Sequence, residues 1–145
     1  MCTRVTSEMH ISHGTICYKV VKLPYKATFK EKLLHILFLQ KKYKTPFYDT
    51  TIQTGKEYVG SPTLTKQLAE EIACPGNLVG RGFIHSFKRK EDAIAIARNL
   101  SSTNKVAVIE CIIPDETPYF DGLFEDITVC HNYISTNLKY VKRVY

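Results

Sequence analysis

The segment KVAVIECII, at residues 105–113, constrains the fold of this chain more than any other stretch. It is rich in valine and isoleucine, whose branched side chains suit a pleated strand, and apolar residues occupy both of its faces. The segment GTICYKVVKL, at residues 14–23, is nearly as apolar from Ile16 to Val21. Because a strand that is apolar on both faces must lie inside a sheet, we predict two central strands.

Residues 27–44 predict a helix. Thr28 and Glu31 have the spacing of a capping box, in which each side chain bonds to the backbone N–H of the other residue. His35 fits a satisfied side chain better than a ligand. A strand or hairpin for HILFL, residues 35–39, is the alternative. The helix would carry one apolar face, made of Leu33, Leu34, Leu37 and Phe38, with Ile36 and Leu39 beside it.

Two further segments predict helices. In residues 61–76, Ser61 or Thr63 would cap the helix, and Pro75 with Gly76 would end it. Residues 88–100 follow with an alanine-rich helical pattern. The inward face of this last helix is expected to hold Ala93, Ile94, Ala97 and Leu100.

Shorter strands are predicted around these helices. Residues 51–60 suggest two strands joined by a turn at Gly55, residues 82–87 a short strand or extended lip, and residues 127–135 and 138–145 two late strands. The segment DETPYFDG is expected to be a loop. About five to seven strands and three helices without βαβα order indicate an α+β fold with a mixed or mostly antiparallel sheet. We expect one compact domain over residues 1–145, with residues 27–44 as a helical insertion.

Length and composition exclude several classes. No apolar run approaches the roughly 18 residues that span a bilayer, and the first residues lack the hydrophobic region of a secretion signal, so we expect a soluble, cytoplasmic protein without membrane contact. The five cysteines form no CxxC pair, which argues against a zinc site. Cys17 and Cys111 fit small core residues. Cys2 would become a terminal nucleophile if Met1 were removed, although no partner motif accompanies it.

The net charge of +6 is unevenly distributed. Residues 22–44 hold seven lysines and one acid, Glu31, whereas residues 114–126 hold five acids and no base. The lysines suit either a contact surface for a polyanion or a solvated helix face. The absence of arginine from residues 22–44 favours the solvated face, because bidentate phosphate contacts usually use arginine.

The common catalytic motifs are absent. The chain has no GxxxxGK[ST], GxGxxG, HExxH or GxSxG, which weakens P-loop, Rossmann, zincin and hydrolase interpretations. His10 and His13, near an N-terminus that we expect to be mobile, would bind a metal only adventitiously. We therefore predict neither a metal site nor a catalytic residue.

Polar and aromatic residues on three segments suggest a ligand-binding cleft. If the segments adjoin, they combine aromatic walls, one fixed cation and neutral hydrogen-bonding groups, which suits a nucleotide. The alternative is structural: Tyr18 and Tyr133 fill the core and His85 caps the following helix. The candidate ligand-binding residues are Tyr18, Lys19, His85, Ser86, Phe87, His131, Asn132 and Tyr133.

Short motifs are spread over most of the chain. They are Met1–Cys2 with Arg4, Cys17–Tyr18–Lys19–Val20, Thr45–Pro46–Phe47, Gly55–Lys56–Glu57–Tyr58, Gly82–Phe83–Ile84–His85–Ser86–Phe87 with Asp92–Ala93, Val108–Ile109–Glu110–Cys111–Ile112–Ile113–Pro114 and Tyr119–Phe120–Asp121–Gly122. This series resembles a family of small uncharacterised proteins from gut Bacteroides and their phages. Against that family's pattern, residues 27–44 and Ile84 are additional. The extra Ile84 would turn His85 to the other face of its strand.

That family in turn resembles a minimal ADP-ribosyltransferase fold. Such enzymes place an arginine or histidine on the first core strand, an aromatic or hydroxyl motif before a helix with an early alanine, and a glutamate on a late strand. By order along the chain, the resemblance assigns these positions to Lys19, to His85–Ser86–Phe87 with Ala93, and to Asn132.

Two departures from the transferase pattern bear on activity. A lysine lacks the bidentate fork of arginine, and the amide of Asn132 lacks the negative charge that the transferase glutamate places at the nicotinamide ribose. The resemblance therefore implies a non-catalytic or weakly catalytic protein, without a resident cofactor, that binds an NAD-derived or cyclic nucleotide. Its setting would be phage counter-defence in the cytoplasm of a bacterial host cell.

Two other hypotheses remain open. An active NAD-dependent ADP-ribosyltransferase would need another carboxylate, such as Glu110 or Glu125. A phage structural protein, or one that binds a host factor, would use the basic segment Lys22–Lys44 and its apolar helix as the contact surface.

Overall fold

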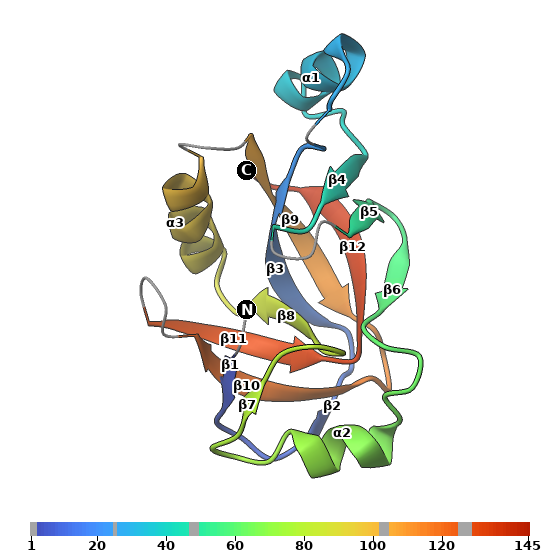
Figure 1. The fold of residues 1–145 in the computed structure, drawn as a ribbon, viewed down its shortest axis with the longest axis vertical. Coiled ribbons are helices and arrows are strands. Elements are labelled where there is room, and N and C mark those ends of the chain that lie inside the picture. Colours follow the sequence, from blue (N-terminus) through green and yellow to red (C-terminus); the bar gives the residue numbers. More distant parts are fainter. Residues whose placement is uncertain (1–2, 25, 47–49, 102–104, 125–128) are drawn as a thin grey trace.

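The computed structural model describes residues 3–24, 26–46, 50–101, 105–124 and 129–145. Within these ranges, three helices accompany one large sheet whose strand pairings are antiparallel. This confirms the predicted α+β class and the mostly antiparallel sheet (Figure 1). None of the helices in the described ranges has the length and apolar character needed to cross a bilayer.

The elements follow one another closely along the chain. The strands are β1 (Thr3–Val5), β2 (His10–Ile11), β3 (Thr15–Lys22), β4 (Lys42–Lys44), β5 (Thr51–Gln53), β6 (Glu57–Val59), β7 (Leu78–Val79), β8 (Ile84–Phe87), β9 (Val106–Ile113), β10 (Pro118–Phe124), β11 (Cys130–Ser135) and β12 (Asn137–Arg143). The helices are α1 (Phe29–Ile36), α2 (Lys66–Ile72) and α3 (Lys90–Leu100).

Strands β3 and β9 lie near the centre of the sheet, as their composition predicts. The strand order is β6-β12-β9-β3-β8-β11-β10-β1-β7, with β2 beside β10 and the β4–β5 hairpin attached to β3. The β3–β9 ladder runs from Thr15↔Ile113 to Lys22↔Val106. Cys17 and Cys111 face each other within it and are fully buried, which confirms them as core residues.

The sheet divides into two halves at the junction of β3 and β8. Within the described residues, only Tyr18 and Phe87 pair across this junction. Figure 1 shows β8, β10 and β11 running across the direction of β3, β9 and β12. Ile84 and Tyr133, from the second half, pack against a core cluster built largely on the first half. The largest core cluster therefore lies between the two halves.

Helices α2 and α3 each cover one of the remaining core clusters. In α3, the fully buried Ala93 and Ala97 permit close packing on the sheet. Ile96 is buried with them, whereas Ile94 and Leu100 are only half-buried, so the helix presents a slightly different face from the one predicted. Helix α2 begins later than expected, because Thr65 caps it in place of Ser61 or Thr63.

Helix α1 is shorter than the helix that we predicted at residues 27–44. The capping box of Thr28 and Glu31 is present as predicted, and both of its hydrogen bonds form. The helix ends at Ile36, because Phe38 adopts a left-handed φ of 59° and the chain then returns to the sheet as β4. His35 is buried, and its ring Nδ1 lies 3.3 Å from the Arg143 guanidinium, in keeping with the expected satisfied side chain.

The segment DETPYFDG is a turn, as its composition predicts, only at its start, around Asp115 and Glu116. Residues from Pro118 onward form β10, which pairs with β11 and β1. Gly122 here serves packing rather than a turn, because a Cβ at this position would lie 2.5 Å from the Thr3 side chain and 2.7 Å from Ile134. Tertiary contacts thus override the local turn preferences.

The N-terminal segment, which we expected to be mobile, is part of the sheet. Strands β1 and β2 both pair with β10. The His10 imidazole lies 3.4 Å from the Asp121 carboxylate and against the Tyr119 ring. The N-terminal segment was mispredicted because strands of two or three residues leave almost no periodic signal.

Candidate functional site

A cavity of about 580 Å³ opens between the two halves of the sheet. Its walls come from β3, β5, β6, β8 and β12, together with the segments that precede β8 and follow β6. A volume of this size suits a small molecule or a mononucleotide. The residues below are those that shape this cavity.

Lys19 projects from the central strand β3 into this cavity. Its side chain is partly buried, and its ammonium group donates a hydrogen bond to the backbone oxygen of His85. Burial lowers the pKa of Lys19 to about 8, an effect that the nearby thiols of Cys111 and Cys17 partly offset. Lys19 is therefore held in place by its hydrogen bond, and it loses its charge at a lower pH than an exposed lysine does.

Tyr58 and Tyr140 form an aromatic wall of the cavity. Their ring centroids lie 5.6 Å apart in an edge-to-face arrangement with an interplanar angle of 83°. The Tyr58 hydroxyl accepts a hydrogen bond from the backbone N–H of Gln53 at 2.8 Å, which fixes the ring on β6 against β5. Burial raises the pKa of Tyr140 well above its ordinary value, so this hydroxyl stays protonated.

Two glycines bring separate backbone segments together beside the cavity. A Cβ on Gly60 would lie 2.1 Å from the backbone oxygen of Gly82, so only glycine permits this approach. Gly82 has a φ of +89°, in the left-handed region that favours glycine. The neighbouring Ser61 and Arg81 thereby reach the cavity from opposite segments.

The described lining of the cavity is electropositive. It contains Lys19 and the exposed Arg81, and none of its described members is an aspartate or glutamate. The hydroxyl groups of Thr45, Thr50 and Ser61 add neutral hydrogen-bonding capacity. Two cations, an aromatic wall and several hydroxyls together suit a ligand that carries negative charge and an apolar ring.

His85 contributes to the cavity through its backbone more clearly than through its ring. Its Nδ1 lies 2.8 Å from the Thr3 hydroxyl, and its Nε2 lies 3.2 Å from the backbone oxygen of Gly80. Since that oxygen only accepts, Nε2 donates and Nδ1 accepts from Thr3. Burial, and then the charge of Lys19, lowers the pKa of His85 to about 4, so the ring is neutral.

The structure separates Ile84 and His85 onto opposite sides of β8. Ile84 packs on the cluster that contains Tyr140, and the His85 ring turns to Thr3 on β1. Successive residues of a strand point to opposite faces, so the residue after Ile84 faces away from the cluster between the sheet halves.

Of the eight candidate residues, Lys19 and His85 line the cavity, and the other six are not in its described lining. Tyr18 and Phe87 pack in the cluster beneath α3. Ser86 is buried beside the Cys17 thiol, and His131 is exposed. Tyr133 is half-buried, with its ring against Tyr119 and its face 5.0 Å from the Lys88 ammonium.

Asn132 is placed apart from the cavity. It lies on β11 between Gly122 of β10 and Phe87 of β8, and its side chain is fully buried. Neither its amide nitrogen nor its amide oxygen has a hydrogen-bond partner among the described residues. The third position that the transferase resemblance assigns is thus not brought beside Lys19 in the described cavity.

Sequence reasoning missed most of the cavity wall. Tyr58, Tyr140 and Arg81 come from segments that are far apart in the chain and carry no shared motif. The glycines at Gly60 and Gly82 are the local signal that could have indicated a close backbone approach, although they do not identify the partner segment.

The described residues contain no group of three or more histidine, cysteine, aspartate or glutamate side chains arranged to hold a metal ion. Comparison of the chain with protein-family models, with curated proteins and with solved structures gave no match.

Proposed function

We propose that the cavity between the sheet halves binds a small anionic ligand with an aromatic ring, of the nucleotide class. The observation that carries this proposal is the position of Lys19, a partly buried cation held at the cavity by the His85 carbonyl group. Arg81 supplies a second positive charge at the same cavity, and the half-buried Tyr58 supplies a ring surface that the buried Tyr140 supports from behind. An NAD-derived or cyclic nucleotide combines the phosphate and the base that such a site accepts.

We also propose that the chain has an ADP-ribosyltransferase-like fold with a ligand-binding cleft. Lys19 stands on a central strand, and His85–Ser86–Phe87 precedes α3 with Ala93 in its first turns, which is the order that the resemblance implies. The cleft between two sheet halves is in keeping with this scaffold. Phage counter-defence, by capture of a nucleotide signal in the bacterial cytoplasm, is the setting we propose for it.

We favour binding over group transfer because of where the carboxylates lie. Transfer from NAD needs a negative charge beside the nicotinamide ribose. Glu110 lies across from Tyr18 on β3, and its carboxylate is 3.6 Å from the Lys142 ammonium. Glu125 lies outside the described residues. The cation-rich described lining supports a binding role for the phosphates of the ligand.

Calorimetry with NAD, ADP-ribose and 3′,5′-cyclic AMP tests the proposal. We expect at least one of them to bind with a 1:1 stoichiometry and to raise the thermal midpoint of the protein. Lys19→Met should lower that affinity by about tenfold or more, since a hydrogen bond to a charged group contributes about 1.5–3 kcal/mol. Lys139→Met, which removes an exposed lysine on β12, is the matched control and should bind like the unmodified chain.

Two results would count against the proposal. One is the absence of both heat and thermal shift for all three nucleotides. The other is equal binding by the Lys19→Met variant and the unmodified chain, which would place the ligand elsewhere. Transfer of label from NAD to a protein, lost in Glu110→Gln or Glu125→Gln, would instead support the active transferase.

A further inference from the structure

Helix α1 is turned so that its apolar side faces away from the protein. Phe29, Leu33 and Ile36 recur at the spacing of one helix face, with Leu37 directly after them. Phe29 is 83% exposed, Ile36 64% and Leu37 55%, and Leu33 is exposed as well. An amphipathic surface helix normally packs this side on the core.

The opposite side of α1 carries the contacts with the protein. His35 is the buried residue of the helix, and the Arg143 guanidinium on β12 donates to its backbone oxygen at 2.6 Å. The same guanidinium nitrogen lies 3.3 Å from His35 Nδ1, which accepts because arginine only donates. Burial, and then the charge of Arg143, lowers the pKa of His35 to about 4. A neutral polar residue therefore docks the helix, and the apolar side stays free.

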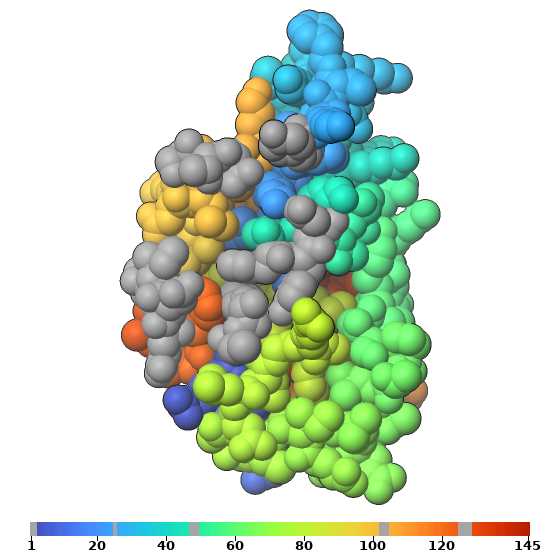
Figure 2. Space-filling model, viewed as in Figure 1, coloured from blue at the N-terminus to red at the C-terminus, as the bar shows by residue number. Residues whose placement is uncertain are grey.

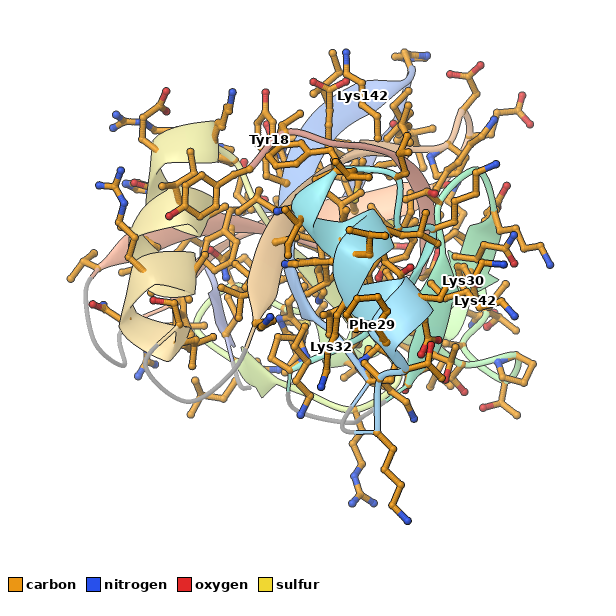
Figure 3. The ribbon with its side chains drawn as sticks, turned by 90° about the horizontal axis from the view of Figure 1, so that it is seen from above. Tyr18, Phe29, Lys30, Lys32, Lys42 and Lys142 are labelled. Carbon is orange, nitrogen blue, oxygen red and sulfur yellow. The ribbon has the colours of Figure 1, made fainter. Side chains whose placement is uncertain are left out.

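Lysines flank the exposed apolar stripe on both sides. Lys30 and Lys32 follow Phe29 by one and three residues, which places them on either side of the stripe around the helix. Figure 3 shows Phe29 between Lys32 on one side and Lys30 with Lys42 on the other. The exposed lysines of this region are Lys26, Lys30, Lys32, Lys41 and Lys42.

The helix also forms one end of the molecule. Figure 1 shows α1 projecting beyond the sheet, and Figure 2 shows the same segment, in blue and cyan, as a protrusion. A convex apolar tip with a cationic rim can enter a soft, flat anionic surface without a matching groove. Lysine stems lie along apolar material while their ammonium groups remain with the headgroups.

We propose that α1 and its flanking lysines, the α1 tip, dock the protein on an anionic lipid surface. From the sequence we expected no membrane contact, and the outward orientation of the apolar stripe is what changes this expectation. A cluster of four to eight basic residues beside an amphipathic helix is typical of binding to anionic lipids. The docking is peripheral and reversible, because the helix has only eight residues and enters only the interface.

The charge and composition of the α1 tip favour a lipid surface as its partner over a second copy of the chain or another protein. A second copy of the chain would place two lysine-rich segments against each other, at a cost in like-charge repulsion. Protein interfaces are enriched in arginine and depleted in lysine, whereas residues 22–44 contain seven lysines and no arginine. The same chemistry, apolar stripe and ammonium groups, matches acyl chains beneath phosphate headgroups.

Sedimentation with vesicles tests the α1 tip. The full chain should bind vesicles of 70:30 phosphatidylcholine and phosphatidylserine in 0.1 M NaCl, and should bind pure phosphatidylcholine far less. Phe29→Ser with Leu33→Ser should lower the bound fraction about tenfold, because burial of apolar area contributes to interfacial binding. The matched control, Leu78→Ser with Val129→Ser, changes two exposed apolar residues elsewhere and should bind normally.

A second double variant tests the contribution of the lysines. Lys30→Gln with Lys32→Gln should weaken binding to the anionic vesicles, and 0.5 M NaCl should weaken it similarly, because salt screens the lipid charge. Lys66→Gln with Lys139→Gln removes the same charge from exposed positions elsewhere and should have little effect. All four changes in the α1 tip affect exposed side chains, and circular dichroism confirms that the variants fold.

Three outcomes would overturn the proposal. The first is no binding to the anionic vesicles. The second is binding that neither the stripe variant nor the lysine variant reduces. The third is a dimer in analytical ultracentrifugation that Phe29→Ser with Leu33→Ser dissociates, which would assign the stripe to a second copy. None of these outcomes bears on nucleotide binding in the cavity.

Discussion

At the scale of single residues, Lys19 matters both for where its ammonium group lies and for the pH at which it loses its charge. It is the cation that β3 presents to the cavity, and its hydrogen bond to the His85 oxygen holds it there. Burial makes the charged form less favourable than in water, and this lowers the pKa to about 8. Its charge is therefore present at neutral pH and is lost in mildly alkaline solution.

This titration predicts a pH dependence of ligand affinity. Below pH 8, Lys19 is charged and meets an anionic ligand directly. Above pH 8, the protein must take up a proton to bind, so the affinity for ADP-ribose should fall by up to about tenfold per pH unit. Calorimetry between pH 6.5 and 9.5 measures this, and the pyrophosphate of the ligand stays ionised throughout.

The Lys19→Met variant provides the control for this pH dependence. Its weaker affinity should vary little over the same range, because the titrating group is gone. An affinity of the unmodified chain that is constant from pH 7 to 9.5 would show that the charge of Lys19 does not contribute to binding.

His85 shows how far residue types alone can mislead about a site. His85 stands next to a serine in a segment that also holds Phe83 and Phe87, and we included it among the candidate ligand-binding residues on that basis. In the structure both ring nitrogens are used, one by Thr3 and the other by Gly80, so the ring supports the fold. Thr3 is 82 residues away in the chain, and no local pattern predicts that contact.

At the scale of elements, the cavity depends on a close approach of two backbone segments. The turn after β6 and the turn before β8 meet where Gly60 lies against the Gly82 oxygen. Each segment then supplies polar groups to the cavity, Ser61 from one and Arg81 from the other. The shape of the cavity mouth is thus set by two glycines that bind nothing themselves.

Substitution of Gly60 by alanine tests this arrangement. The added Cβ would lie 2.1 Å from a backbone atom that cannot rotate away, so the segments must separate. We expect a loss of about 1–3 kcal/mol in the free energy of unfolding, typical of overpacking, together with weaker nucleotide binding. Urea denaturation and calorimetry measure the two effects.

Gly55→Ala is the matched comparison. Its Cβ would meet nothing within 4 Å, although its φ of +87° costs about 1–2 kcal/mol for a residue with a side chain. Its stability should fall, while nucleotide affinity stays unchanged. If Gly60→Ala binds nucleotide as well as Gly55→Ala does, the contact between the two turns does not shape the site.

Elements with strong periodic patterns could be predicted, and those fixed by distant contacts could not. The apolar runs of β3 and β9 and the alanine pattern of α3 were read correctly, because burial leaves a direct trace in composition. Strand β10 was taken for a loop, since its proline, aspartate and glycine prefer turns when considered locally. Its place in the sheet comes from pairing with β11 and β1.

At the scale of the whole molecule, two sheet halves joined through β3 and β8 create both the core and the cavity. The core cluster between the halves contains Tyr140 and also lends that side chain to the cavity wall. The cleft that we predicted from the sequence required Lys19, His85 and Asn132 to lie side by side. The halves bring the first two together, whereas Asn132 lies between β8 and β10.

The molecule also has two candidate binding surfaces with different chemistry. The cavity faces are lined by cations and aromatic rings, and the α1 tip carries an apolar stripe with lysines on both sides. The sequence concentrates seven lysines at residues 22–44, but only the structure shows which side of the helix faces outward. Orientation of an exposed helix depends on contacts such as Arg143 with His35, which composition does not reveal.

The most direct test of the central claim is a methyl NMR titration with ADP-ribose. Ile52 and Ile84 line the cavity, whereas Ile36 lies on α1 and Ile94 on α3. We predict that the δ1-methyl signals of Ile52 and Ile84 shift in a saturable way, while those of Ile36 and Ile94 stay in place. Shifts confined to Ile36 or Ile94, or no shift at millimolar ligand, would contradict nucleotide binding in this cavity.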